Sequence, residues 1–221
     1  MGTLLELEDP VPRLCGELAA RFGLRVDAAT ARRALAAEIA HYRAHMTTDG
    51  GDAAGVRALR VECARVLRDA LGAAAAPLGL DDLVAALLAS LRFRPYPDAA
   101  PALRALRENA GLRLVVASNW DVSLHDVLDQ AGLRELVDGV VTSAEAGAPK
   151  PGGAVFARAL ALARVTPDRA VHVGDSVAED VDGARAAGIV PILIVRGTPP
   201  APPPPGVRVV HALTGLAAPA A

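Results

Sequence analysis

The chain has 221 residues, 52% of them hydrophobic, and a formal net charge of −2. This length suits one large domain or one domain with an insertion, and the balanced charge and 3% aromatic content argue against a nucleic-acid surface. The apolar runs are too short to span a membrane, no signal peptide is recognisable, and Cys15 and Cys63 have no disulfide or metal-ligand pattern. We therefore expect a cytoplasmic protein without membrane or nucleic-acid partners.

The first part of the chain has the pattern of a helical unit. Apolar residues recur at helical spacing, and turn and capping residues divide them into separate segments. The four expected helices are residues 12–22, 27–46, 53–71 and 80–91. No alternating strand pattern is present in this stretch.

After Pro97, short β-rich runs alternate with helical ones. The expected strands are residues 112–117, 139–142, 170–173, 190–195 and 207–210, and the expected helices are residues 101–108, 123–130, 154–163 and 178–187. The proline-rich residues 198–206 predict a stiff surface loop. This alternation predicts a parallel sheet with helices on both faces, in which ligands bind at the carboxyl ends of the strands.

Polar side chains follow two of these strands. Ser118 and Asn119 end the first, where Ser118 could bind a phosphoryl oxygen or serve as an ordinary helix N-cap. Asp175 follows the run 170–173, and Asp180 comes five residues later. Two carboxylates at a strand-to-helix turn suit Mg²⁺, although Asp180 could also be a favourable charge near a helix N-terminus.

Lys150 is the single lysine among 23 basic residues. Chance survival is the plain explanation, because a lone Lys-Pro step is usually a loop with a solvated cation. At a strand end, however, a compact ammonium would neutralise a phosphate as a point charge, which a planar guanidinium does not imitate.

The order of these features resembles the haloacid dehalogenase-like (HAD) hydrolase superfamily. Three motifs carry the resemblance: Ser118-Asn119, Lys150-Pro151 and Gly174-Asp175-Ser176-x-x-x-Asp180. The resemblance implies an α/β fold, a Rossmann-like parallel-sheet core with an inserted all-helical cap. Residues 1–8 and 96–221 would form the core, and residues 9–95 the cap.

The resemblance also implies a phosphatase that acts on a small phosphorylated metabolite, with Mg²⁺ as cofactor and a phosphoaspartyl intermediate. Ser118 would bind the phosphoryl group, with Asn119 beside it, and Lys150 would offset charge on the nucleophile and the phosphate. Asp175 would ligate Mg²⁺, and Asp180 would ligate it or hold Lys150.

The chain departs from the family at its start, where the first motif is a strand ending Asp-x-Asp-Gly-Thr-Leu. Gly2-Thr3-Leu4 matches the end of this motif, so the nucleophile would lie two residues before Met1. We expect a chain that lacks this central strand and, as written, is inactive. Either an internal methionine was taken as the start or the protein is a degenerate relative. Two neighbouring strands would then lack a hydrogen-bonding partner.

Two other functions stay open. A non-catalytic binding protein is supported by the missing nucleophile. A haloacid dehalogenase is less favoured, because it works without Mg²⁺ and the paired carboxylates suit a metal. In the helical segment, Glu38, His41 and His45 share one face, which could be a metal site or a substrate contact, but a solvated polar face is the plainer interpretation.

Overall fold

The computed structural model describes residues 2–108, 112–197 and 202–216. The chain divides into two compact units: a helical unit, Leu7–Phe93, and an α/β unit, Met1–Glu6 with Arg94–Ala221. We expected the boundaries after residues 8 and 95, and they fall after residues 6 and 93. Met1 and part of the expected loop 198–206 lie outside the described residues.

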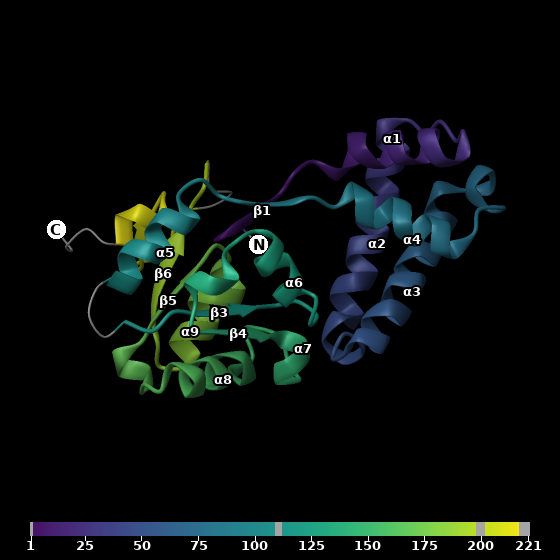
Figure 1. Ribbon diagram of the computed structural model, residues 1–221. Helices are drawn as coiled ribbons and strands as arrows, with labels where there is room; N and C mark the ends of the chain where they lie inside the picture. Colours follow the sequence, from purple (N-terminus) through teal and green to yellow (C-terminus); the bar gives the residue numbers. More distant parts are fainter. Residues whose placement is uncertain (1, 109–111, 198–201, 217–221) are drawn as a thin grey trace. The chain divides into compact units, whose positions relative to one another are not determined.

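The elements of the helical unit are helices, three of which begin at capping aspartates. They are α1 (Pro10–Phe22), α2 (Ala28–Asp49), α3 (Ala53–Leu71), the 3₁₀ turn η1 (Ala73–Ala75) and α4 (Leu80–Ser90) (Figure 1). Asp9, Asp27 and Asp52 accept hydrogen bonds from backbone N–H groups in the first turns of α1, α2 and α3. Leucine and alanine side chains from all four α-helices form the core of this unit. The four expected helices are thus confirmed.

The α/β unit alternates strands with helices. Its strands are β3 (Val115–Ser118), β4 (Gly139–Thr142), β5 (Val171–Gly174), β6 (Val190–Ile194) and β7 (Arg208–Val210). Its α-helices are α5 (Ala99–Glu108), α6 (Leu124–Gln130), α7 (Ser143–Ala146), α8 (Gly153–Ala163) and α9 (Gly183–Ala186). Its tighter or wider turns are η2 (Arg134–Leu136), η3 (Pro167–Arg169), η5 (Leu213–Leu216) and the π-helical η4 (Val177–Asp182). These strands pair in parallel, which confirms the Rossmann-like α/β prediction.

Two further strands, β1 (Leu5–Leu7) and β2 (Phe93–Pro95), pair with each other. They contain the two points where the chain crosses from one unit to the other. The Glu8 N–H donates to the Arg92 carbonyl and the Tyr96 N–H to the Leu4 carbonyl, both at 3.0 Å, so these segments run antiparallel. The sequence analysis missed them because three residues are too few to establish a period of two.

The parallel strands form two sheets among the described residues. β3 pairs with β4, and β6 lies between β5 and β7. Among the described residues, no strand pairs with the second edge of β3 or β5. All of β4 is buried, but β3 is only half-buried and Val171 at the start of β5 is 59% exposed. No described strand bridges these two edges, so the parallel strands are divided between the two sheets.

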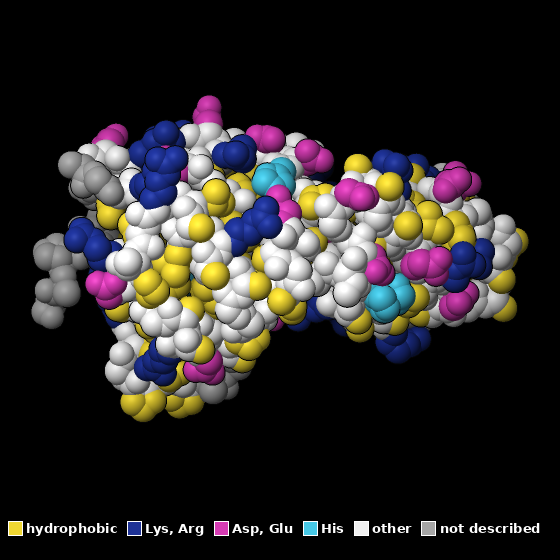
Figure 2. Space-filling model, turned by 90° about the horizontal axis from the view of Figure 1, so that it is seen from below, with side chains coloured by type: hydrophobic (Ala, Val, Ile, Leu, Met, Phe, Trp, Pro, Cys, Tyr) yellow, Lys and Arg dark blue, Asp and Glu magenta, His cyan; other side chains and the backbone are white. Residues whose placement is uncertain are grey.

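The surface agrees with the charge pattern of the sequence. Figure 2 shows one face of the molecule, on which basic and acidic side chains are scattered among apolar ones. In the described ranges, no helix combines the length and apolar character needed to cross a membrane.

Candidate active site

Lys150 is the centre of a buried polar network. Its backbone is held by Asn119, whose Oδ1 accepts from the Lys150 N–H at 2.7 Å and whose Nδ2 donates to the Lys150 carbonyl at 3.0 Å. Its ammonium donates to the Ala117 carbonyl on β3 at 3.0 Å and to Asp180 Oδ1 at 2.6 Å. One side chain therefore connects the end of β3 with the segment that follows β5.

Asp180 is 4% exposed, and both of its oxygens have donors. Oδ1 also lies 2.9 Å from His172 Nε2, and Oδ2 accepts from the Ser176 N–H at 3.0 Å. Burial alone would raise the pKa of Asp180, but the His172 hydrogen bond and the Lys150 ammonium outweigh it and hold the pKa well below its usual value. Of the two roles implied for Asp180, holding Lys150 fits this geometry, since an ammonium at this distance repels a bound cation.

Glycines allow the chain to fold closely around Asp180. A Cβ atom on Gly174 would overlap the Asp180 carboxylate, and one on Gly183 would lie 2.7 Å from the Phe156 ring. The Ser176 hydroxyl accepts from the Glu179 N–H at 3.2 Å and caps the turn. Gly174 and Gly183 are therefore needed for the close packing that brings Asp180 to Lys150.

Asp175 is exposed, unlike Asp180. Its Oδ1 accepts from the Thr3 hydroxyl at 2.8 Å. Gly2, with a φ of 89°, packs against the same carboxylate so closely that an added Cβ would collide with it. The exposed carboxylate in this cradle fits one ligand of a hydrated Mg²⁺, which commonly binds through one or two carboxylates and keeps several waters.

The protein alone does not supply a complete metal cage in the described ranges. There, no three His, Cys, Asp or Glu side chains gather closely enough to hold a metal ion. A divalent cation at Asp175 would therefore need water and phosphate oxygens as further ligands, as Mg²⁺ at phosphoryl-transfer sites often does.

Lys150 brings the end of β3 and Asp180 together. Ser118 ends β3, directly after the Ala117 carbonyl that binds Lys150, and pairs in register with Thr142 of β4. Asn119, expected beside the phosphoryl group, instead uses both ends of its amide on the Lys150 backbone. The sequence identified Asn119 but not this positioning role, because spacing along the chain does not reveal which backbone an amide will meet.

The shared face of Glu38, His41 and His45 forms no metal site in the part of the chain that the structure describes. Glu38 is 4% exposed and hydrogen-bonded to Cys63. The His41 and His45 rings stack on each other with centroids 4.2 Å apart. The expectation of a solvated polar face is therefore wrong for Glu38.

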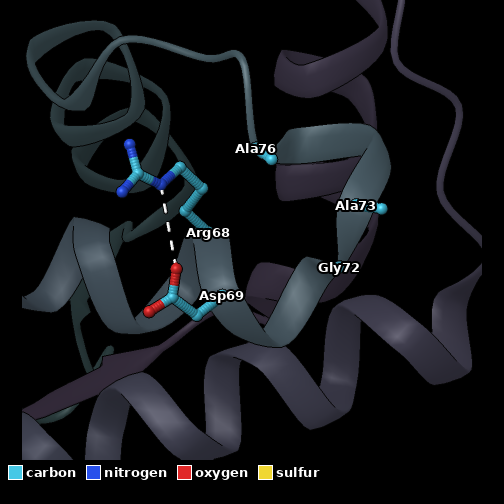
Figure 3. A pocket seen from close by; sticks show the side chains of 5 residues that line it. All are labelled: Arg68, Asp69, Gly72, Ala73 and Ala76. Atoms are coloured by element: carbon cyan, nitrogen blue, oxygen red, sulfur yellow. Dashed lines mark ion pairs between the residues drawn. The ribbon is translucent and has the colours of Figure 1, made fainter.

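A separate pocket of about 310 Å³ lies in the helical unit (Figure 3). It is lined by Arg68, Asp69, Gly72, Ala73 and Ala76. Arg68 Nε lies 3.8 Å from Asp69 Oδ1, and the other lining residues are small and apolar. The pocket therefore offers one ion pair and no converging set of polar groups to orient a ligand.

Comparison with known proteins identifies the family. A family model described as "haloacid dehalogenase-like hydrolase" matches residues 1–188. The chain belongs to the haloacid dehalogenase-like hydrolases. The resemblance inferred from the three motifs is thus confirmed.

The relatives include proteins of named activity. The chain is 46% identical over 97 residues to the haloacid dehalogenase-like hydrolase domain-containing protein 3 of Bos taurus, over 44% of this chain and 38% of the relative. It is 37% identical over 142 residues to a phosphoserine phosphatase of Thermus thermophilus, over 63% of this chain and 57% of the relative. Both matches span less than two thirds of the relative's own length.

Solved structures share the fold. A defluorinating L-2-haloacid dehalogenase superposes with a TM-score of 0.70 and 22% identity, over 95% of this chain and 89% of that chain. At this identity the likeness shows the fold alone, and the reaction has to be argued from the site.

Proposed function

We propose that the α/β unit binds the phosphoryl group of a small phosphorylated metabolite, in a site of the Mg²⁺-dependent phosphatase type. The observation that carries this proposal is the buried Lys150–Asp180 pair. An ammonium has three N–H donors, and Ala117 and Asp180 accept from two of them. The third can reach a phosphoryl oxygen at the strand ends, where the Ser118 hydroxyl also lies. The phosphoserine phosphatase relative supports the same substrate class.

Mg²⁺ would be held by Asp175, and when bound it would offset the negative charge of the phosphoryl group. The other tasks belong to the chain itself. Lys150 neutralises and orients the phosphoryl oxygens, Asp180 and Asn119 keep Lys150 in place, and Ser118 donates a hydrogen bond. This division assigns one carboxylate to the cation and the other to the lysine.

The assignment of Asp175 to the cation and of Asp180 to Lys150 also has a consequence for turnover. Of the described carboxylates at these strand ends, Asp180 is committed to Lys150 and Asp175 is assigned to the cation, so neither is placed as a nucleophile. We therefore propose that this chain binds phosphate without releasing it from a substrate. A dehalogenase is less well supported, because it has no use for a cation at Asp175.

Binding and turnover can be measured separately. Calorimetry with orthovanadate, in the presence and absence of Mg²⁺, should give Mg²⁺-dependent binding that Asp175→Asn weakens by about tenfold or more. Glu179→Gln, in the same turn, is the matched control and should bind as the unaltered chain does. Phosphate release from p-nitrophenyl phosphate should stay at the level of the buffer.

Each part of the proposal can fail separately. If orthovanadate does not bind, or Asp175→Asn binds it normally, the proposed site is wrong. If the chain releases phosphate in an Mg²⁺-dependent manner, the site stands and the proposed lack of turnover is wrong.

A further inference from the structure

Arg196, two residues after β6, binds the turn formed by Gly2 and Thr3. Its Nε donates to the Gly2 carbonyl at 3.1 Å, and its Nη2 donates to the Thr3 carbonyl at 2.7 Å. Its Nη1 lies 3.0 Å from Asp98 Oδ1, and its guanidinium carbon lies 3.7 Å from the centre of the Tyr96 ring. All three nitrogens of the planar guanidinium are therefore engaged, which the single nitrogen of a lysine cannot reproduce.

The residues around Arg196 are themselves anchored. Asp98 Oδ2 accepts from the Leu213 N–H at 2.6 Å, and the Tyr96 N–H donates to the Leu4 carbonyl at 3.0 Å. Little of the Arg196 side chain is exposed, so the guanidinium is held between a carboxylate and an aromatic face with limited access to water. Arg196 therefore has a fixed position from which to hold the turn.

The other side of the turn faces the proposed cation ligand. The Thr3 hydroxyl donates to Asp175 Oδ1, and Gly2 packs against the same carboxylate. A shift of the turn would remove a hydrogen bond and a steric wall from Asp175 together. The carboxylate orientation therefore depends on contacts that Arg196 makes with the backbone of the turn.

We propose that Arg196 is a positioning residue that sets the orientation of the Asp175 carboxylate through the Gly2–Thr3 turn. Its effect on cation binding rests on the proposed role of Asp175, whereas its effect on Asp175 itself does not. Partners of this kind, one step away from a metal ligand, commonly change metal affinity by about 10- to 100-fold.

The first measurement uses Mn²⁺, whose free form is detected by electron paramagnetic resonance. Arg196→Lys and Thr3→Val should each weaken Mn²⁺ binding by about tenfold, and the double variant should lose less than the two single losses combined, since both act on one turn. The matched control is Arg185→Lys, because Arg185 is exposed and donates from Nη2 to the Pro205 carbonyl at 3.0 Å. It should bind Mn²⁺ as the unaltered chain does.

The second measurement needs no metal. The ¹³C chemical shift of the Asp175 carboxyl group, recorded in the metal-free chain, should change in Arg196→Lys and Thr3→Val but not in Arg185→Lys. Thr3→Val keeps the shape of the side chain and removes its hydroxyl, so it tests the link between the turn and Asp175 if Arg196→Lys fails to fold.

The outcomes separate this inference from the proposed function. If Asp175→Asn binds Mn²⁺ as tightly as the unaltered chain, the proposed cation site is wrong. The positioning role of Arg196 is then tested only by the ¹³C chemical shift of the Asp175 carboxyl group. An Asp175 shift that is equal in Arg196→Lys and Arg185→Lys overturns the inference. So does unchanged Mn²⁺ affinity in Arg196→Lys when Asp175→Asn has lost it.

Discussion

The two units differ in where their polar groups find partners. In the helical unit, Asp9, Asp27 and Asp52 accept from backbone groups two or three residues away. In the α/β unit, Lys150 binds groups 33 and 30 residues away. Arg196 binds carbonyls 194 and 193 residues away. The first kind of contact forms with the helix itself, whereas the second exists only in the complete fold.

This difference has a consequence for stability. Local caps and a leucine core stabilise the helical unit through its own sequence. The α/β unit relies on buried charges that cost free energy when left alone, and among its described parallel strands only β6 is paired on both edges. We therefore expect the α/β unit to be the more sensitive to single substitutions at polar residues.

The largest effect is expected from Asp180→Ala. The variant would leave the Lys150 ammonium buried without its carboxylate and remove the partner of His172. Breaking such a pair on one side costs about 3–5 kcal/mol. Hydrogen exchange should show the loss at amides of the α/β unit, while those of the helical unit keep their protection.

The control for Asp180→Ala is an exposed ion pair of the helical unit. Glu62→Ala breaks the contact between Glu62 and Arg65 Nε at 3.1 Å and should cost about 0–1 kcal/mol. The expected difference between the units would be wrong if Asp180→Ala and Glu62→Ala lost similar free energies of unfolding. It would also be wrong if Asp180→Ala lowered the hydrogen-exchange protection of both units equally.

A smaller effect is expected from Lys150→Arg. The charge is kept, but a broad guanidinium cannot occupy the place of an ammonium between the Ala117 carbonyl and Asp180 Oδ1. Orthovanadate binding should weaken by about tenfold, which corresponds to ~1.4 kcal/mol. If Lys150→Arg binds orthovanadate with unchanged affinity, position 150 does not require a lysine, and its lysine is there by chance.

The sequence placed two candidate site residues at the ends of strands. Ser118 ends β3 and Asp175 directly follows β5, and parallel strands bring their carboxyl ends together, whereas Lys150 lies beyond α7 in the segment after β4. It left open whether Asp180 ligates a metal or holds Lys150, because a π-helical turn decides which way that carboxylate points. It gave no sign of Arg196, since nothing near position 196 indicates that its partners lie at positions 2 and 3.

In the helical unit, Glu38 is an exception to local polar pairing. We expected Glu38 on a solvated face. Its spacing with His41 and His45 shows that the three share one face of the helix, but it does not show what packs against that face. Glu38 is buried and meets Cys63 from the next helix. A single buried carboxyl of this kind should therefore make the helical unit sensitive to pH.

The smallest predicted effect is that Glu38→Gln stabilises the helical unit at neutral pH. Burial raises the pKa of Glu38 above its usual value, and the Cys63 hydrogen bond offsets this only in part. The folded state therefore binds the proton more tightly than the unfolded state. The associated stability is fully present below the unfolded pKa and is lost as the pH rises through the folded pKa.

Keeping the Glu38 carboxyl buried becomes less favourable as the pH rises, and an amide of the same shape avoids this pH-dependent cost. Because the pKa of Glu38 is raised in the folded state, we expect Glu38→Gln to gain stability at pH 7, and this gain should shrink towards pH 4. Urea unfolding at both pH values measures the gain, with the exposed Glu62→Gln as the matched control on α3. If Glu38→Gln gains the same stability at both pH values, Glu38 acts through packing and not through its charge. The buried ionisable groups that matter for stability would then lie in the α/β unit.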